Sequence, residues 1–240
     1  MIKVESLCKT FGDVQAVKDI SFTADNNLVT GLLGPNGAGK STTLRILYGL
    51  LKQDSGEAFI DEFNLKTHRV AAQKRIGVLP DSHGLYTRLT AREHIHFFGR
   101  LHGVDENELE NKANELIGLL DMNAIADRRV EGFSQGERMK VCLSRSLIHS
   151  PSNVILDEPT NGLDVMTTRT VREIISELKR QGVAVLFSSH LMHEVSRLCD
   201  KIIIVSQGTV VATGTTDEIR ESTGEDNLED AFVKLAEKDI

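Results

Sequence analysis

Residues 34–41 read Gly-Pro-Asn-Gly-Ala-Gly-Lys-Ser, and this stretch decides the fold. It follows an apolar run, Val29–Leu33, and opens a helical stretch, Ser41–Leu51. A glycine-rich loop between a strand and a helix presents backbone N–H groups to phosphate, because glycine reaches backbone angles closed to other residues. The positive end of the helix adds attraction for an anion. The pattern predicts a nucleoside triphosphate site, and the alternative is a glycine-rich structural turn.

Two residues of this loop have separate predicted roles. Lys40 is expected to reach the β- and γ-phosphates and so to act in catalysis, while the Ser41 hydroxyl is expected to ligate Mg²⁺. The residues predicted to bind nucleotide are Gly34, Pro35, Asn36, Gly37, Ala38, Gly39, Lys40, Ser41 and Thr42.

Outside the loop, runs of strand length alternate with helical stretches. The early runs are Lys3–Leu7, Asp19–Ala24, Val29–Leu33, Ala58–Ile60 and Ile76–Leu79. From residue 154, strand and helix alternate as Val154–Leu156, Thr167–Gln181, Val183–Phe187, His193–Leu198 and Lys201–Ser206. This alternation predicts a parallel sheet. Between the two blocks, residues 90–125 carry apolar residues at helical spacing.

Asp157 and Glu158 end the apolar strand at 154–156, where an α/β sheet presents its chemistry. Asp157 is predicted to hold Mg²⁺ through water, and Glu158 to orient and deprotonate the attacking water. Phosphoryl transfer asks mainly for positioning and charge neutralisation, so this pair with Lys40 and Ser41 suffices once the γ-phosphate is enclosed. Paired acids before Pro159 otherwise cap the next helix.

A second motif, Phe133-Ser134-Gln135-Gly136-Glu137, stands ahead of that strand and opens a helix. Phosphate loop, Ser-X-Gly-Glu turn and Asp-Glu pair occur in the order found in ATP-binding subunits of ABC transporters, which the chain resembles over residues 1–220. The resemblance implies ATP and Mg²⁺ as ligands and ATP hydrolysis as the activity. It also implies a facing second subunit, which is either another copy or a homologous chain. Ser134 and Gly136 would complete the nucleotide site of that subunit.

With the strand pattern, the resemblance implies an α/β fold with a P-loop NTPase core. We expect a mostly parallel sheet, an antiparallel β-subdomain and an inserted helical subdomain within one domain, residues 1–240. The core is assigned to residues 1–89 and 151–220, the helical signature subdomain to 90–150 and a C-terminal tail to 221–240.

Three further residues match the family's functional positions. Phe11 corresponds to the aromatic residue that stacks on adenine, and its alternative role is core packing. Asp164, in Gly162-Leu163-Asp164, corresponds to the loop that crosses to the partner subunit, and its alternative role is a helix N-cap. His190 corresponds to the switch histidine, which contacts the γ-phosphate and links Glu158 to the opposing subunit. A single histidine at a strand end is otherwise a structural residue.

The chain departs from the family pattern in two places. The signature usually reads Leu-Ser-Gly-Gly-Gln, whereas Phe133, Gln135 and Glu137 replace three of its residues here. The family also places Gln after the strand Ile76–Leu79, near Mg²⁺ and the attacking water, where this chain has Pro80-Asp81. Asp81 then either binds the metal or repels the phosphate and slows closure until a membrane partner docks. We favour the second interpretation.

Residues 81–93 are where the family docks the cytoplasmic helix of a separate membrane permease. The Asp81 variant and the segment Asn227–Phe232 resemble two-polypeptide exporters, in particular those for sodium extrusion. A surface loop and an ordinary amphipathic helix are the alternative interpretations of these two segments.

Composition limits the remaining function classes. A net charge of −7 and a pI near 5.6 argue against a nucleic-acid-binding surface. Three separated cysteines, Cys8, Cys142 and Cys199, are typical of reduced thiols in a cytosolic protein. No apolar run approaches the roughly 20 residues of a membrane span, so we expect a cytoplasmic protein that is peripheral on the membrane. The alternative function is a soluble ABC-type ATPase acting on ribosomes or DNA. The single phosphate loop, the short insertion and the acidic net charge of this chain disfavour that alternative.

Overall fold

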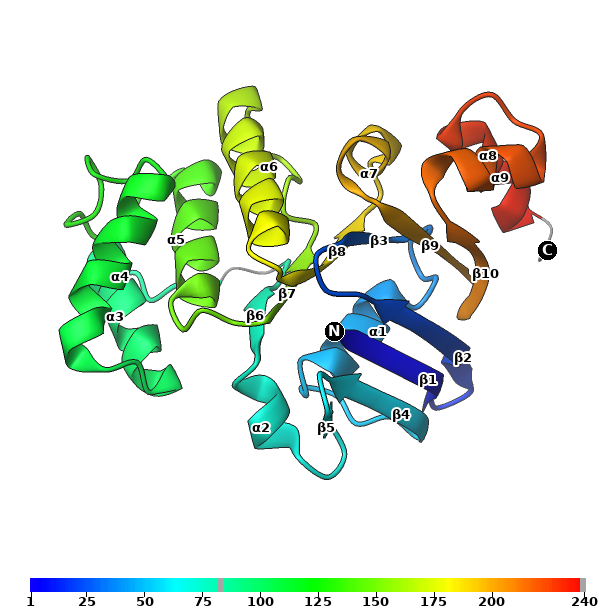
Figure 1. Cartoon of the computed structure of the whole chain (residues 1–240), viewed down its shortest axis with the longest axis horizontal. Coiled ribbons are helices and arrows are strands. Elements are labelled where there is room, and N and C mark those ends of the chain that lie inside the picture. The colour runs from blue at the N-terminus through cyan, green and yellow to red at the C-terminus, as the bar shows by residue number, and fades with distance from the viewer. Residues whose placement is uncertain (82–83, 238–240) are drawn as a thin grey trace.

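A six-stranded sheet runs through the middle of the molecule in our computed structural model, which describes residues 1–81 and 84–237 (Figure 1). The strand order is β10-β9-β3-β8-β7-β6. The strands are β3 (Val29–Leu33), β6 (Ile76–Leu79), β7 (Asn153–Asp157), β8 (Ala184–Ser189), β9 (Lys201–Ser206) and β10 (Thr209–Gly214). Neighbours from β9 to β6 pair in parallel, and β10 joins β9 as an antiparallel hairpin.

Side chains of this sheet alternate between two apolar cores. Ile155, Leu186 and Ile203 pack on one face, whereas their chain neighbours Leu156 and Phe187 pack on the other. Successive residues of a strand point to opposite faces, so a sheet covered on both sides needs strands that are apolar throughout. The continuous apolar runs in the sequence have this cause.

One face is covered by a second sheet and a helix. The second sheet is antiparallel, has the order β2-β1-β4-β5 and contains β1 (Ile2–Phe11), β2 (Val14–Ala24), β4 (Ser55–Ile60) and β5 (Phe63–Asn64). The helix is α1 (Lys40–Leu47), and the short α2 (Arg69–Gln73) lies beside β5. This layer carries the phosphate loop at its boundary with the central sheet.

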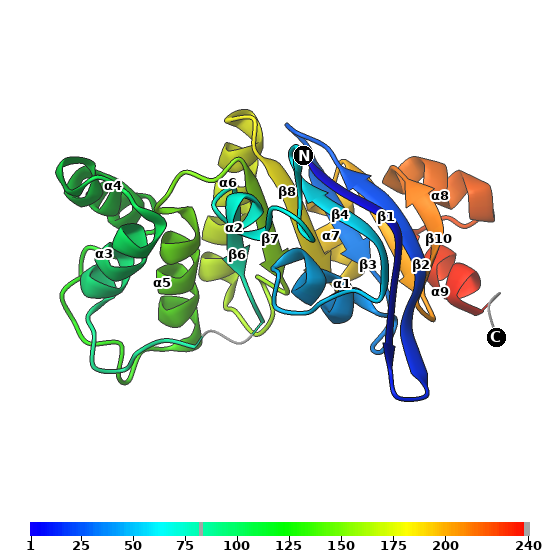
Figure 2. The same cartoon turned by 90° about the horizontal axis from the view of Figure 1, so that it is seen from below.

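Helices cover the other face. They are α3 (Ala91–His102), α4 (Glu106–Leu119), α5 (Gln135–Leu147), α6 (Val165–Arg180), α7 (Met192–Leu198), α8 (Thr216–Thr223) and α9 (Leu228–Glu237). Both views place α3, α4 and α5 at one end of the molecule and α8 and α9 at the other (Figure 2). Within the described residues, no helix combines the length and the apolar content needed to cross a bilayer.

The structure confirms the α/β class, the mostly parallel sheet and the separate antiparallel sheet. The predicted helical stretch at 90–125 is two helices, because Gly103 ends α3 at a φ of 79° and Asp105 caps α4. The helix expected over Ser41–Leu51 ends at Leu47. The division into core, helical subdomain and tail stays a prediction, since apolar residues of α3–α5 share one core with the sheet.

Candidate nucleotide site

The loop between β3 and α1 needs its glycines for two separate reasons. Gly39 caps α1 with a φ of 101°, in the left-handed region, and a Cβ there would lie 2.5 Å from the Ala16 carbonyl oxygen. At Gly34 a Cβ would lie 2.3 Å from the Val205 carbonyl oxygen. Any larger residue would displace the loop from the sheet, so the backbone forms a cradle of the kind that holds phosphate.

The buried Lys40 side chain folds back along this loop. Its Nζ donates to the carbonyl oxygens of Gly34 at 2.6 Å and Pro35 at 3.1 Å. Burial lowers the pKa of Lys40, and the nearby carboxylates of Glu158 and Asp157 act in the opposite direction. The ammonium therefore binds the loop and lies within electrostatic reach of the two acids predicted to serve hydrolysis.

Asp157 and Glu158 are positioned by the neighbouring strand β8. Asp157 pairs with Ser188 in register, and the Ser188 hydroxyl donates to Asp157 Oδ1 at 2.6 Å. The Glu158 N–H donates to both the carbonyl and the hydroxyl oxygen of Ser188, each at 3.1 Å. Ser188 thus holds both acids, and the sequence reasoning missed it. A hydroxyl residue at the end of the adjacent strand was the available signal.

Glu158 has a strained backbone and a histidine partner. Its φ of 51° lies in the left-handed region, which costs a non-glycine residue on the order of 1–3 kcal/mol. His190 Nδ1 lies 2.8 Å from Glu158 Oε2. Strained residues concentrate at functional sites, so we infer that the fold maintains the orientation of the Glu158 carboxylate.

Several charges surround Asp157. Burial raises the pKa of Asp157, and the charges of Asp81 and Glu158 raise it further, while the Ser188 hydrogen bond and Lys40 lower it. Asp81 therefore lies within electrostatic reach of Asp157. Among the described residues, no group of three or more acidic, histidine or cysteine side chains could hold a metal by itself.

Phe11 lies on the rim of the same site rather than in the core. Its side chain is 48% exposed, and the Lys9 ammonium lies 5.5 Å from the ring centroid. A pocket of about 420 Å³ joins Phe11 to the phosphate loop and is lined by Phe11, Val14, Gln15, Ala16, Lys18, Asn36, Gly37, Ala38, Gly39, Lys40, Ser41, Thr42 and Gln207. An exposed ring beside a phosphate loop is suited to stacking on a nucleobase.

The remaining predicted residues lie at the N-termini of α5 and α6. Ser134 caps α5: its hydroxyl accepts from the Glu137 N–H at 3.2 Å, and Glu137 accepts from the Ser134 N–H at 2.8 Å. Asp164 caps α6, accepting from the N–H of Thr167 at 3.0 Å and from its hydroxyl at 2.7 Å. The structure thus shows the N-cap role of Asp164, and its crossing to a partner stays a prediction.

The chain matches the ABC transporter family over residues 17–161. It belongs to that family. It is 40% identical to the ABC transporter ATP-binding protein NatA of Bacillus subtilis (strain 168), with 97% of each chain covered. It is 35% identical to the linearmycin resistance ATP-binding protein LnrL of the same organism, covering 95% of this chain and 73% of LnrL.

Solved structures of ABC proteins share the fold. An ATP-binding subunit of an ABC transporter superposes with a TM-score of 0.92 at 29% identity, covering 98% of this chain and 99% of that one. The dimeric structure of the bacterial ABC transporter cassette MJ0796 gives a TM-score of 0.81 at 24% identity, covering 90% and 98%. At that identity the second likeness concerns the fold alone.

As an ABC protein, the chain is an ATP-binding subunit of a transporter and an ATPase that uses ATP with Mg²⁺. The roles of individual residues remain proposals. Lys40, Asp157, Glu158 and His190 are brought together by the structure, whereas Ser134 and Asp164 belong to the α5 and α6 termini.

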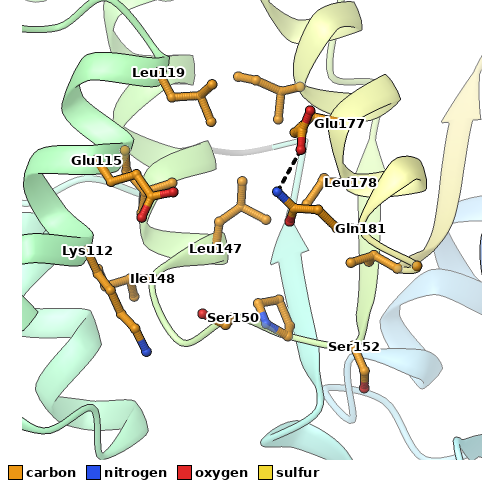
Figure 3. A pocket seen from close by; sticks show the side chains of 15 residues that line it. Lys112, Glu115, Leu119, Leu147, Ile148, Ser150, Ser152, Glu177, Leu178 and Gln181 are labelled. Atoms are coloured by element: carbon orange, nitrogen blue, oxygen red, sulfur yellow. Dashed lines mark hydrogen bonds between the residues drawn. The ribbon is translucent and has the colours of Figure 1, made fainter. Parts of the chain in front are cut away.

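A second pocket of about 380 Å³ lies apart from the nucleotide site of this ABC protein (Figure 3). Lys112 and Glu115 line it from α4, and Glu177 of α6 and the α6 C-cap Gln181 line it from the other side, over an apolar floor that includes Leu147. Ser152 and Val183 also line it and precede β7 and β8, whereas Asp157 ends β7 and Glu158 follows it. The two pockets thus lie toward opposite ends of the parallel strands.

Proposed function

We propose that this chain powers an ABC exporter as a nucleotide-sandwiched dimer bound to a separate membrane permease on the cytoplasmic face of the membrane. One observation carries the proposal: the strained Glu158, held by Ser188 and His190, lies within electrostatic reach of Lys40 in the phosphate loop. That arrangement supplies a positioned base and a charge for the phosphates at one place.

Each residue has a defined part in hydrolysis. Glu158 orients and deprotonates the attacking water, and the His190 contact fixes the direction of its carboxylate. Lys40 exchanges its bonds to the Gly34 and Pro35 carbonyls for the β- and γ-phosphates. Ser41 and Asp157 would hold Mg²⁺, which would neutralise charge on the phosphates.

The second half of the site comes from another subunit. Ser134 and Gly136 face the γ-phosphate of that partner, and Asp164 lies in the loop that crosses to it. Two large apolar side chains beside Asp164 support an interface here, since Val165 is 85% and Met166 70% exposed. The partner is a second copy or a homologous chain.

The permease is proposed to dock on the segment 81–93, of which Ser82 and His83 lie outside the described residues. Tyr86 stacks on His94 and meets Phe97 edge to face, and its N–H donates to His94 Nε2 at 3.0 Å. Leu85, Tyr86, Thr87, Arg88, Leu89 and Phe97 line an apolar hollow of about 610 Å³. An apolar hollow of this kind is suited to the apolar face of a short helix.

Export, and sodium extrusion in particular, is the finer version of the proposal. It is supported by the similarity to NatA over nearly the whole chain and by Asp81 near the metal site, as in the exporters that the sequence resembles.

Isolation of the chain from membranes tests this function. Wild-type protein should co-purify with a polytopic membrane protein that stimulates its ATPase activity. Tyr86→Ala should lose that partner while keeping basal ATPase activity, because Tyr86 lies outside the catalytic residues. Recovery of only ribosomes or DNA would overturn the proposal and favour the soluble ABC-type ATPase.

A further inference from the structure

Gln135 makes a side-chain contact that links two loops of the proposed half-site. It is the first residue of α5, and its Nε2 donates to the Asn161 carbonyl oxygen at 2.9 Å. Next along that loop, a Cβ on Gly162 would lie 2.7 Å from Gln135 Nε2 and 3.0 Å from Oε1. The amide therefore occupies the space that a side chain at residue 162 would fill.

The same residue, Asn161, is also hydrogen-bonded to the backbone of Glu158. The Asn161 N–H donates to the Glu158 carbonyl oxygen at 3.1 Å. Asn161 thus accepts a hydrogen bond from Gln135, in the turn 133–137, and donates one to the backbone of Glu158. Glu158 in turn contacts His190. Hydrogen bonds therefore link Gln135, through Asn161, to the backbone of Glu158 within one chain.

A second contact joins the first turns of α5 and α6. A Cβ on Gly136 would lie 2.9 Å from Thr167 Oγ1, so the first turns of α5 and α6 touch. Thr167 also donates its hydroxyl to Asp164 at 2.7 Å. Gln135 and Gly136, which are neighbours in the chain, therefore contact the two ends of the segment 161–167.

Gln135 and Asn161 are both exposed. A hydrogen bond between exposed groups contributes little to folding stability, because water competes for both partners. Its main effect is on the orientation of the turn relative to the loop. Gln135 is also one of the residues in which this chain departs from the usual signature, where glycine has no side chain to make the contact.

We propose that Gln135 is a positioning residue that couples the two ATP sites of the dimer. The turn at 133–137 meets the partner's nucleotide, and Gln135 passes its position through Asn161 to Glu158 in the chain's own site. This inference rests on the proposed dimer. Coupling of this kind makes hydrolysis at one site depend on occupancy of the other.

Gln135→Met tests the coupling, because it keeps side-chain length and removes the donor. The matched control is Gln181→Met: Gln181 Nε2 donates to Glu177 Oε1, also at 2.9 Å, at the far end of α6 (Figure 3). The readouts are the Hill coefficient for ATP, kcat, KM and ATP affinity of the monomer.

We expect Gln135→Met to bring the Hill coefficient from above one toward one and to lower kcat on the order of 2- to 30-fold. KM and monomer affinity should stay at wild-type values, because the Lys40 loop is untouched, and Gln181→Met should match wild type throughout. Unchanged kcat and Hill coefficient in Gln135→Met, or a wild-type Hill coefficient of one, would overturn the coupling alone. Failure of Glu158→Gln to dimerise with ATP would instead overturn the proposed dimer, and this inference with it.

Discussion

His190 and Glu158 are in hydrogen-bond contact across the ends of two strands, with Nδ1 2.8 Å from Oε2. Glu158 follows β7 and His190 follows β8, and these strands pair in parallel with Asp157 opposite Ser188. The contact is therefore set by sheet register rather than by flexible loops. With its backbone held by Ser188 and its carboxylate by His190, Glu158 loses little freedom when the reaction begins, which favours its use as a positioned base.

Glu158→Gln should separate chemistry from binding. The amide keeps the shape of the side chain but cannot accept the proton, so the rate should fall by about 10²–10⁴, or about 3–5 kcal/mol of barrier. ATP binding should survive, and a dimer should accumulate on size-exclusion chromatography with ATP and Mg²⁺. Ser134→Arg in the same background should leave ATP-bound monomer, and monomer in both proteins would contradict the shared site.

Lys40→Ala should weaken ATP binding and lower hydrolysis by about 10²–10³-fold or more, since the loop loses its charge toward the phosphates. Fluorescent nucleotide binding and phosphate release measure the two effects. Lys140→Ala is the control, because the Lys140 ammonium also donates to a backbone carbonyl, that of Asp121, but far along the chain from the loop. Near-native turnover in Lys40→Ala would show that another site hydrolyses ATP.

Asp81→Gln should raise basal ATPase activity and weaken stimulation by the permease. The carboxylate adds negative charge near Asp157 and so opposes the approach of the γ-phosphate until the partner docks. Measurements with and without reconstituted permease decide the matter. A lower basal rate would favour direct metal binding by Asp81, and no change in either condition would place Asp81 outside the site.

His149 should make the fold acid-sensitive. Burial, with the charge of the stacked His102, lowers the pKa of His149 to about 4. The His149 ring takes up a proton below about pH 6.5 in the unfolded chain, but only near pH 4 in the folded chain. The free energy of unfolding therefore decreases as the pH is lowered across that window. Between about pH 7.5 and about pH 5 the loss should reach up to about 2 kcal/mol.

Urea unfolding at both pH values measures the His149 effect. His149→Gln keeps a donor for the Ile76 carbonyl oxygen, which lies 3.1 Å from His149 Nε2, but has no titrating ring. The variant should lose less stability on acidification than wild type. An equal loss in both proteins would assign the acid sensitivity to other groups.

Tyr48→Phe should leave stability unchanged or increase it by about 1 kcal/mol, which corresponds to about 2–4 °C in Tm for a chain of this size. Tyr48 is 6% exposed, and its hydroxyl is buried without a hydrogen-bond partner among the described residues. Calorimetry compares it with Tyr86→Phe, where the side chain is exposed and the change should be small. A marked destabilisation by Tyr48→Phe would mean that the hydroxyl is satisfied.

Local pattern was enough to predict β3, β6 and the phosphate loop. Each signal, a short apolar run for the strands and a glycine-rich turn for the loop, is contained in a few consecutive residues. The observed bounds of β3 and β6 match the expected ones. The β5 strand was missed because two residues cannot show a period. The β9–β10 hairpin was missed although Gln207-Gly208, both with positive φ, form a two-residue turn.

Contacts across the sheet could not be predicted from the chain alone. Ser188 supports Asp157 from 31 residues away, and Gln135 reaches Asn161 from 26 residues away. Each depends on strand register or helix placement, which no local period encodes. The residue types of the site could therefore be predicted, but the groups that hold them could not.

The order of strands has a consequence for synthesis. The central strand β3 ends at residue 33, yet its sheet neighbours β8 and β9 begin at residues 184 and 201. At roughly 5–20 residues per second, a ribosome needs on the order of 8–30 s to supply those neighbours. During that time the antiparallel sheet can pair within the first 64 residues, while the apolar β3 has no parallel partner. The nascent chain should therefore depend on chaperones until its last third emerges.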